Sequence, residues 1–276
     1  MNLHTMTDLG RMRTMTSAEL RQTFLVEALF QPGAITLVRT DLDRAIVGSA
    51  VPGARALTLE PPPELRASSF TERRELGVLN LGGAGSILVD GERHAMAARD
   101  ALYVGRGDHK IVFESDRPDA AARFYFVSYP AHAVYPTTHA SFADAAPLRL
   151  GTSADANERT IYKYIHEDGI QSCQLMMGFT WLEEGSVWNT MPPHWHLSRS
   201  EIYLYFDLPA EACVIHLMGA PDETRHLIVR NEQAVLSPPW SIHSGAGTQR
   251  YGFAWAMGGE NREFADMEAV SPKILR

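Results

Sequence analysis

Residues 77–113 read GVLNLGGAGSILVDGERHAMAARDALYVGRGDHKIVF, a series of short apolar runs separated by Gly, Asp and Arg. Turn-forming residues recur about every eight to twelve positions, a spacing typical of strands in antiparallel sandwiches and barrels. Runs of the same kind occupy residues 34–51 and 122–131 and, after a break, much of 160–258. We therefore predict an all-β protein built from antiparallel strands.

A segment near the N-terminus departs from this pattern. Thr16 or Ser17 can cap a first helical turn. Within residues 13–31, apolar side chains recur at helical spacing, namely Leu20, Phe24, Leu25 and Leu29. This pattern predicts a short N-terminal helix.

The stretch from Tyr129 to about Thr160 is rich in Ala, Pro, Thr and Ser and has weak periodicity. A chain of 276 residues is long enough for two domains of ordinary size. We interpret the stretch as a connection and predict an N-terminal domain over 1–150 and a C-terminal domain over 151–276.

Charge and cysteine content narrow the classes of protein. The net charge is −8, and no Lys/Arg cluster offers the basic face that nucleic acid requires, so we expect no nucleic-acid partner. Cys173 and Cys213 lie far apart without CxxC spacing, which favours a reducing compartment. No apolar segment matches a signal peptide or a membrane span. We expect a cytoplasmic protein with no membrane partner.

Residues 194–201, HWHLSRSE, carry the chemistry. On a strand His194 and His196 leave by the same face, and Glu201 begins the next strand after a short turn. His243 follows a Pro-rich turn in SPPWSIHSGAG, residues 237–247. A single histidine on a strand is more often a core or surface residue, but three imidazoles and one carboxylate form a ligand set for zinc, iron, manganese or nickel. Such a set leaves positions open for water or substrate, as catalytic sites do.

The spacing HxH, four residues, E, then a later H resembles the metal signature of the cupin superfamily of antiparallel β-barrels. The likeness extends over nearly the whole chain to the 4-deoxy-L-threo-5-hexosulose-uronate ketol-isomerases, also called 5-keto-4-deoxyuronate isomerases. The blocks that carry it include ERRELGVLNLGGAGSILVDGE, CQLMMGFTWLEEGSVWNTMPPHWH, EIYLYFDL and ETRHLIVRNEQAVLSPPWSIHSGAGT. The family often has Thr where Trp195 stands, and we expect the indole to point away from the metal.

The resemblance implies a bicupin, usually a hexamer, whose zinc ligands fall on His194, His196, Glu201 and His243. Manganese or iron is not excluded, because nitrogen and oxygen ligands accept several ions. The family interconverts 5-keto-4-deoxyuronate and 3-deoxy-D-glycero-2,5-hexodiulosonate during breakdown of pectin and related uronates. The N-terminal half lacks an HxH motif, so its barrel is expected to be metal-free and to serve structure and oligomerisation.

The identity of the general base stays open at this point. A metal-bound water, Glu201, Glu183, Glu184, Glu232 and His226 all qualify by motif, and we favour the water or a carboxylate near the metal, such as Glu201.

Several residues are candidates for binding the substrate. Its carboxylate requires a cation. The candidates are Lys163, Arg199 and Arg225 for the carboxylate, Tyr203 for sugar oxygens, Met191 for the wall of the pocket, and His226 as a further substrate-binding residue. An iron-dependent dioxygenase and a non-catalytic sugar-binding cupin are the alternative functions, and metal content and oxygen uptake distinguish them.

Overall fold

A computed structural model describes all 276 residues of the chain. The chain forms two compact units, and neither is a continuous stretch of sequence. The first contains Met1–Leu3, Ala28–Ala145 and Tyr164–Met176. The second contains His4–Glu27, Ala146–Lys163 and Met177–Arg276.

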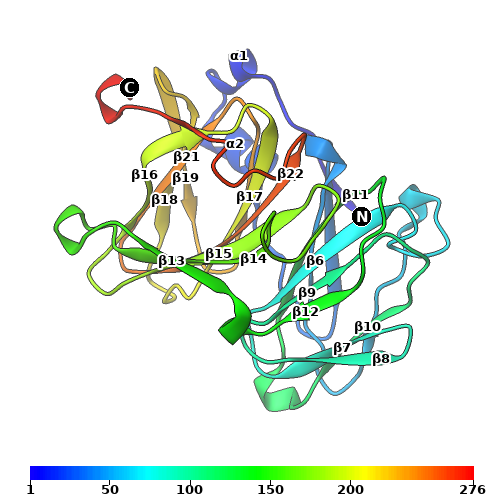
Figure 1. Cartoon of the computed structure of the whole chain (residues 1–276). Coiled ribbons are helices and arrows are strands. Elements are labelled where there is room, and N and C mark those ends of the chain that lie inside the picture. The colour runs from blue at the N-terminus through cyan, green and yellow to red at the C-terminus, as the bar shows by residue number, and fades with distance from the viewer. The chain divides into compact units, whose positions relative to one another are not determined.

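The first unit is built from two sheets (Figure 1). Seven strands follow the order β1-β3-β4-β11-β6-β9-β12, and four follow the order β5-β10-β7-β8. Their bounds are β1 Asn2–His4, β3 Ile35–Thr40, β4 Ile46–Ala50, β5 Leu57–Thr58, β6 Arg74–Asn80, β7 Gly85–Val89, β8 Glu92–Met96, β9 Ala101–Val104, β10 Ile111–Ser115, β11 Phe124–Pro130 and β12 Thr138–Ala140.

Apolar side chains fill the core of the first unit. Phe124 and Phe126 alternate inward along β11, and Phe126 stacks on Phe113 of β10 with ring centroids 5.8 Å apart. Val78 and Leu102 add to the same buried cluster. Every second residue of these strands therefore lies on the face that packs against the core, as in any sheet with one buried face.

The second unit also contains two sheets. Their orders are β13-β14-β15-β22-β17-β20-β2 and β19-β18-β21-β16-β23. Their bounds are β2 Leu25–Val26, β13 Ala146–Leu150, β14 Arg159–Ile165, β15 Met176–Leu182, β16 Trp188–Trp195, β17 Arg199–Phe206, β18 Val214–Ala220, β19 Glu223–Val229, β20 Ala234–Ser237, β21 Ile242–Gly247, β22 Gly252–Gly259 and β23 Glu268–Ala269. Short 3-10 turns occur at Leu42–Arg44, Pro63–Leu65, Pro118–Ala120, Phe142–Asp144, Ser153–Asp155 and Pro272–Ile274.

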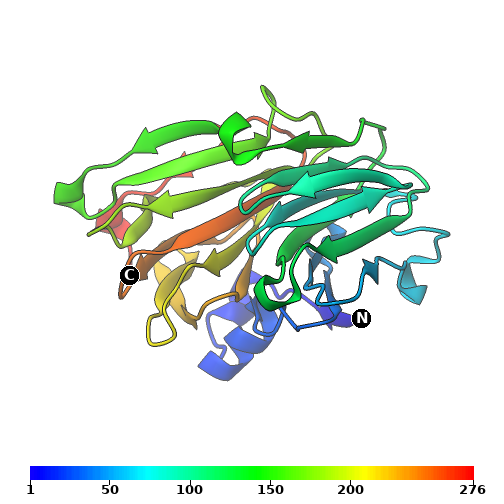
Figure 2. The same ribbon diagram turned by 90° about the horizontal axis from the view of Figure 1, so that it is seen from below.

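Two helices, α1 (Leu9–Met12) and α2 (Ser17–Phe24), contact strands of the second unit, and both views show them in blue beside β18 and β19 (Figures 1 and 2). Thr16 caps α2, and Glu19 completes a capping box, which confirms the predicted helix start. The helix ends at Phe24, earlier than the apolar spacing indicated. Leu25 and Val26 pair with β20 instead, because the free backbone groups of this edge strand bond to a segment in extended conformation.

The stretch read as a connection contains two strands that the sequence did not reveal. β12 pairs with β9 and β13 pairs with β14, each at the edge of its sheet. All five residues of β13 are exposed, so no apolar alternation marks it. Edge strands lack the buried face on which the sequence pattern depends.

The prediction of an all-β fold with a short N-terminal helix is confirmed by this architecture. Neither helix has the length and apolar character that crossing a membrane demands.

Candidate metal centre

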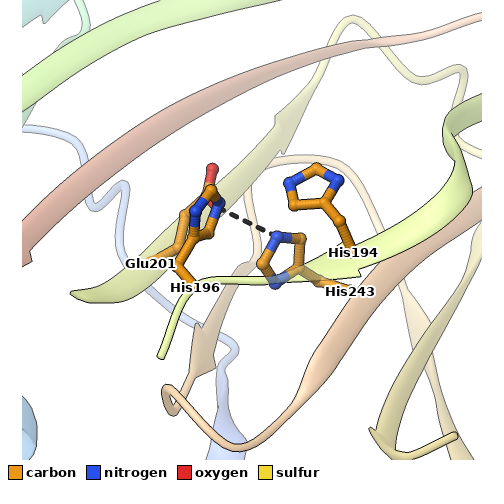
Figure 3. A group of neighbouring side chains, drawn as sticks. All are labelled: His194, His196, Glu201 and His243. Carbon is orange, nitrogen blue, oxygen red and sulfur yellow. Dashed lines mark ion pairs between the residues drawn. The ribbon is translucent and has the colours of Figure 1, made fainter. Parts of the chain in front are cut away.

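Three elements of the second unit carry the four predicted ligands to one place. β16 holds His194, with His196 just beyond its end, β17 holds Glu201, and β21 holds His243. β16 and β21 pair so that His194 lies opposite His243, whereas β17 belongs to the other sheet. Figure 3 shows the four side chains turned toward one point between these strands.

The four side chains are close enough to share one ion. Their potential ligand atoms all lie within 4.8 Å of one another. Glu201 Oε2 is 3.2 Å from His196 Nε2 and 3.1 Å from His243 Nε2. The ring of His194 is 4.5 Å from that of His243, between centroids.

Burial leaves part of this cluster unsatisfied. Glu201 Oε2 and His243 Nε2 are fully shielded from solvent and neither has a hydrogen-bond partner in the protein. Buried polar atoms normally have a hydrogen-bond partner or a metal ion bound to them. Two neighbouring buried atoms without such a partner therefore indicate that both bind the same missing group. A divalent cation among three nitrogens and one carboxylate oxygen fits this donor set.

Burial and neighbouring charges set the protonation of the cluster. Burial raises the pKa of Glu201, but the imidazoles of His243 and His196 outweigh this effect, and the net shift is well below the ordinary value. Burial, followed by the nearby His243, lowers the pKa of His194 well below the ordinary value. An ionised carboxylate beside a neutral imidazole is the state in which both bind metals.

Residues around the cluster contact the sides of these ligands that face away from the common point. His196 Nδ1 lies 2.6 Å from the Asp266 carbonyl oxygen, and donating a proton to it leaves Nε2 bare toward the cluster. His243 Nδ1 lies 3.3 Å from Ser237 Oγ. Tyr203 lies beside Glu201, and burial, followed by the charge of that carboxylate, raises the pKa of the phenol well above its usual range. Contacts of this kind fix ring orientation in metal sites.

The cluster lines a cavity of about 240 Å³. Small-molecule sites commonly enclose about 300–1,000 Å³, so the space suits a small ligand. Its other walls are mostly apolar, with Met191, Phe253, Trp255 and Phe264 among them. Tyr203 lines the cavity as well. Of the side chains considered as general base, only Glu201 does so.

The other candidates for substrate binding lie outside this lining. Arg199 is buried behind His196, and its guanidinium donates to the Glu263 and Asp266 carbonyl oxygens. Arg225 donates to the carbonyl oxygens of Met12, Arg13 and Met15 beside the N-terminal helices. The Lys163 ammonium lies 5.2 Å from the centre of the Phe264 ring. His226 is exposed on β19.

Arg159 is a cavity residue that the motif search missed. It begins β14 and shares a face with Ile161, which also lines the cavity. Period-two alternation in RTIYKYI would have grouped Arg159 with Ile161 and Lys163, but it does not show that this face turns toward the ligands.

The ligand strand β16 is irregular where it approaches the cluster. Its pairing with β21 shifts register between Asn189 and His194. Thr190 has a φ of 44°, an unfavourable conformation for a β-branched residue, and its hydroxyl donates to the His243 carbonyl oxygen. The consecutive prolines Pro192 and Pro193 cannot donate to the ladder, which accounts for the interrupted pairing.

Trp195 lies on the opposite face of β16 from the imidazoles, as the alternation predicts. Its indole Nε1 donates to Glu268 Oε2 at 2.8 Å, and Trp195 is absent from the cavity lining.

Comparison with known proteins extends this picture to the whole chain. The model of the KduI/IolB family matches residues 25–270. The chain belongs to this family. A 4-deoxy-L-threo-5-hexosulose-uronate ketol-isomerase of Shouchella clausii is 53% identical over 264 residues, covering 96% of each chain. A protein of the same name from Caldicellulosiruptor bescii is 52% identical over 267 residues, covering 97% of each.

A solved member of the same fold is an IolB-like protein from Salmonella typhimurium. It superposes with a TM-score of 0.73 at 14% identity, covering 90% of this chain and 96% of the other. At that identity the likeness concerns the fold alone, and it agrees with the cupin-like architecture expected of the KduI/IolB family.

Proposed function

We propose that the protein is a divalent-metal-dependent ketol-isomerase that converts 4-deoxy-L-threo-5-hexosulose uronate into 3-deoxy-D-glycero-2,5-hexodiulosonate. The observation that carries the proposal is the convergence of His194, His196, Glu201 and His243 on one buried point of a small cavity. Full-length relatives of the chain bear the name of this isomerase. A sugar acid of hexose length is a ligand of the size that the cavity suits.

The reaction moves a proton between adjacent carbons. It leaves the carbon that bears the hydroxyl and is returned to the neighbouring aldehyde carbon, while the two oxygens exchange roles. A divalent cation held by His194, His196, Glu201 and His243 supplies a Lewis acid for the carbonyl oxygen. Zinc is the ion that we propose, with manganese or iron as alternatives, because the donor set accepts all three.

Glu201 is the residue that we assign to proton transfer. It is the only carboxylate in the cavity lining. Tyr203 remains protonated next to Glu201, because burial and that carboxylate raise the pKa of its phenol. Met191 and the aromatic wall exclude water from the reacting carbons, which strengthens electrostatic contacts there.

A coupled assay with purified protein and 5-keto-4-deoxyuronate tests the proposal. Turnover should be measured before chelation, after chelation, and after adding back zinc, manganese or iron, with dissolved oxygen followed throughout. We expect turnover that chelation abolishes and metal restores, without oxygen uptake. Oxygen consumption would favour the dioxygenase. Binding of the sugar acid without turnover would favour a non-catalytic cupin.

Several wider properties are part of the same proposal. We propose a cytoplasmic hexamer that acts in the breakdown of pectin or related uronates. The first unit serves structure and assembly without a metal of its own. Its apolar core, filled by side chains such as Phe113, Phe124 and Phe126, supports the structural role.

A further inference from the structure

The cavity lining contains one cation, Arg159. It stands among side chains that are mostly apolar or belong to the ligand cluster, and it is half-buried at the start of β14. One guanidinium nitrogen, Nη1, donates to the Asn157 carbonyl oxygen at 2.8 Å. The other nitrogens have no partner in the protein, so they are available to a ligand.

Arg159 is not neutralised by the acidic residues near it. The polar cavity next to the site is lined by Arg159 together with Arg149, Glu158, Thr160, Glu183 and Glu184. None of the three glutamates pairs with Arg159, and Glu183 accepts a hydrogen bond from Thr160 instead. Burial lowers the pKa of Arg159, although an arginine stays protonated at any physiological pH. A partly desolvated cation of this kind is a strong site for a carboxylate.

The proposed substrate has two ends that a metal site can bind. At one end an aldehyde adjoins a hydroxyl, which is the pair that reacts. At the other end a ketone adjoins the carboxylate, and a 2-oxo acid offers two oxygens to a cation equally well. Binding by the second end would place the wrong carbons beside Glu201. A productive site therefore has to hold the carboxylate away from the four ligands.

We infer that Arg159 binds the carboxylate of the substrate and thereby directs the aldehyde end toward His194, His196, Glu201 and His243. The inference rests on the proposed function and deepens it. Arg159 is then the residue that makes the enzyme selective for sugar acids over neutral sugars, because the guanidinium fork matches a carboxylate in geometry as well as in charge.

Kinetics with two substrates test this assignment. The natural acid and its methyl ester, which keeps both carbonyls and lacks the negative charge, should be compared for wild type, Arg159→Met and Arg159→Lys. For Arg159→Met we expect kcat/KM with the acid to fall about 100-fold, the scale of losing a charge pair that is removed from water. With the ester the same variant should stay within about threefold of wild type. Arg159→Lys should recover part of the loss.

The two kinetic constants separate orientation from affinity. If Arg159 orients the acid, Arg159→Met lowers kcat, because part of the bound acid then occupies the ligands through its 2-oxo acid end. Loss of the ion pair weakens binding in addition. A change in KM alone would overturn the orienting role. Equal losses with acid and ester would overturn carboxylate binding and show a structural role.

Arg149→Met is the matched control. Arg149 is an exposed arginine of β13 that borders only the neighbouring polar cavity, so the variant should behave as wild type with both substrates. Metal content, measured for every variant, should be unchanged. If wild type turns over neither substrate, the proposed function fails and the inference fails with it, an outcome distinct from selective loss in the variant.

Discussion

Glu201 combines two tasks at the scale of a single side chain. The imidazoles of His243 and His196 keep it ionised despite its burial, and the Tyr203 phenol lies beside it. A buried carboxylate without these partners would take up a proton instead. The environment of Glu201 therefore preserves a charge that can bind a cation and accept a proton.

We predict that Glu201→Gln abolishes turnover. The amide keeps the shape of the side chain but loses the charge, and general-base catalysis alone contributes about 10²- to 10⁴-fold. Steady-state kinetics and metal content by mass spectrometry measure the effect, and both should drop. Glu158→Gln is the control, because Glu158 is exposed outside the site cavity. A Glu201→Gln variant with most of its activity would place the catalytic site elsewhere.

His216 is a buried imidazole beneath the cluster that reports on pH. Its Nδ1 lies 2.7 Å from the Tyr205 hydroxyl, its Nε2 has no partner, and its ring is 5.7 Å from that of Tyr203. Burial, and then His243, lowers its pKa to about 3. The folded state therefore holds His216 neutral at a pH where the unfolded chain is already protonated.

We predict that His216 makes the protein less stable as pH falls from about 6.5 toward 3. In that window His216 is protonated in the unfolded chain but neutral in the folded chain. The free energy of unfolding therefore decreases as the pH decreases. At pH 5 the loss is about 2 kcal/mol for this residue. Urea unfolding of wild type and His216→Gln at pH 7.5 and pH 5.0 measures it. The variant should lose about 2 kcal/mol less between the two pH values, and equal losses would refute the assignment.

At the scale of elements, one side chain of β19 contacts the segment between the two N-terminal helices. Arg225 of β19 reaches three carbonyl oxygens of residues 12–15, the shortest contact being 2.6 Å to Met15. These bonds add partners to carbonyls at and beyond the end of α1, where a helix leaves its last carbonyl oxygens without i+4 donors. Arg225 thus stabilises the chain where it passes from α1 to α2.

We predict that Arg225→Met lowers the free energy of unfolding by about 2 kcal/mol, the scale of hydrogen bonds to a charged group. Chemical denaturation measures the change, and Arg250→Met is the control because Arg250 is exposed in a turn. Kinetics on the same variant address the substrate role expected from the sequence. A large rise in KM without loss of stability would support that role over the structural one.

The ligand strands show why the site needs more than its motif. β16 carries His194 and leads directly to His196, and its register with β21 shifts ahead of His194. β17 is regular and pairs on both sides, Glu201 lying opposite Ser237 of β20 and Met257 of β22. The site therefore combines an irregular strand of one sheet with a regular strand of the other.

At the scale of the whole molecule, one chain holds the complete cluster. All four candidate ligands and the cavity belong to the second unit. The four candidate ligands are therefore complete without a residue from another copy.

We predict a hexamer in solution, as the family resemblance implies. Sedimentation velocity at several concentrations gives the mass, and activity measured over the same range shows whether assembly matters. Because the ligands are complete in one chain, kcat per chain should change little on dissociation. A monomer at every concentration would refute the hexamer, and loss of kcat on dilution would show that assembly shapes the cavity.

The sequence by itself determined the strand-rich fold, the capped helix and the four residues that converge. Each depends on local chemistry or on period-two alternation, which survive in a single chain without tertiary information. Edge strands such as β13 were not predicted, because all residues of β13 are exposed and no alternation of apolar and polar residues marks the strand.

Only the tertiary structure decided which cation faces the cavity. Arg159, Lys163, Arg199 and Arg225 are equivalent as letters, yet one lines the cavity, one packs over an aromatic ring and two bind backbone carbonyls. The physical reason is that a long charged side chain takes its role from whatever partner the fold brings within reach, and strand pairing over long sequence separations sets that partner.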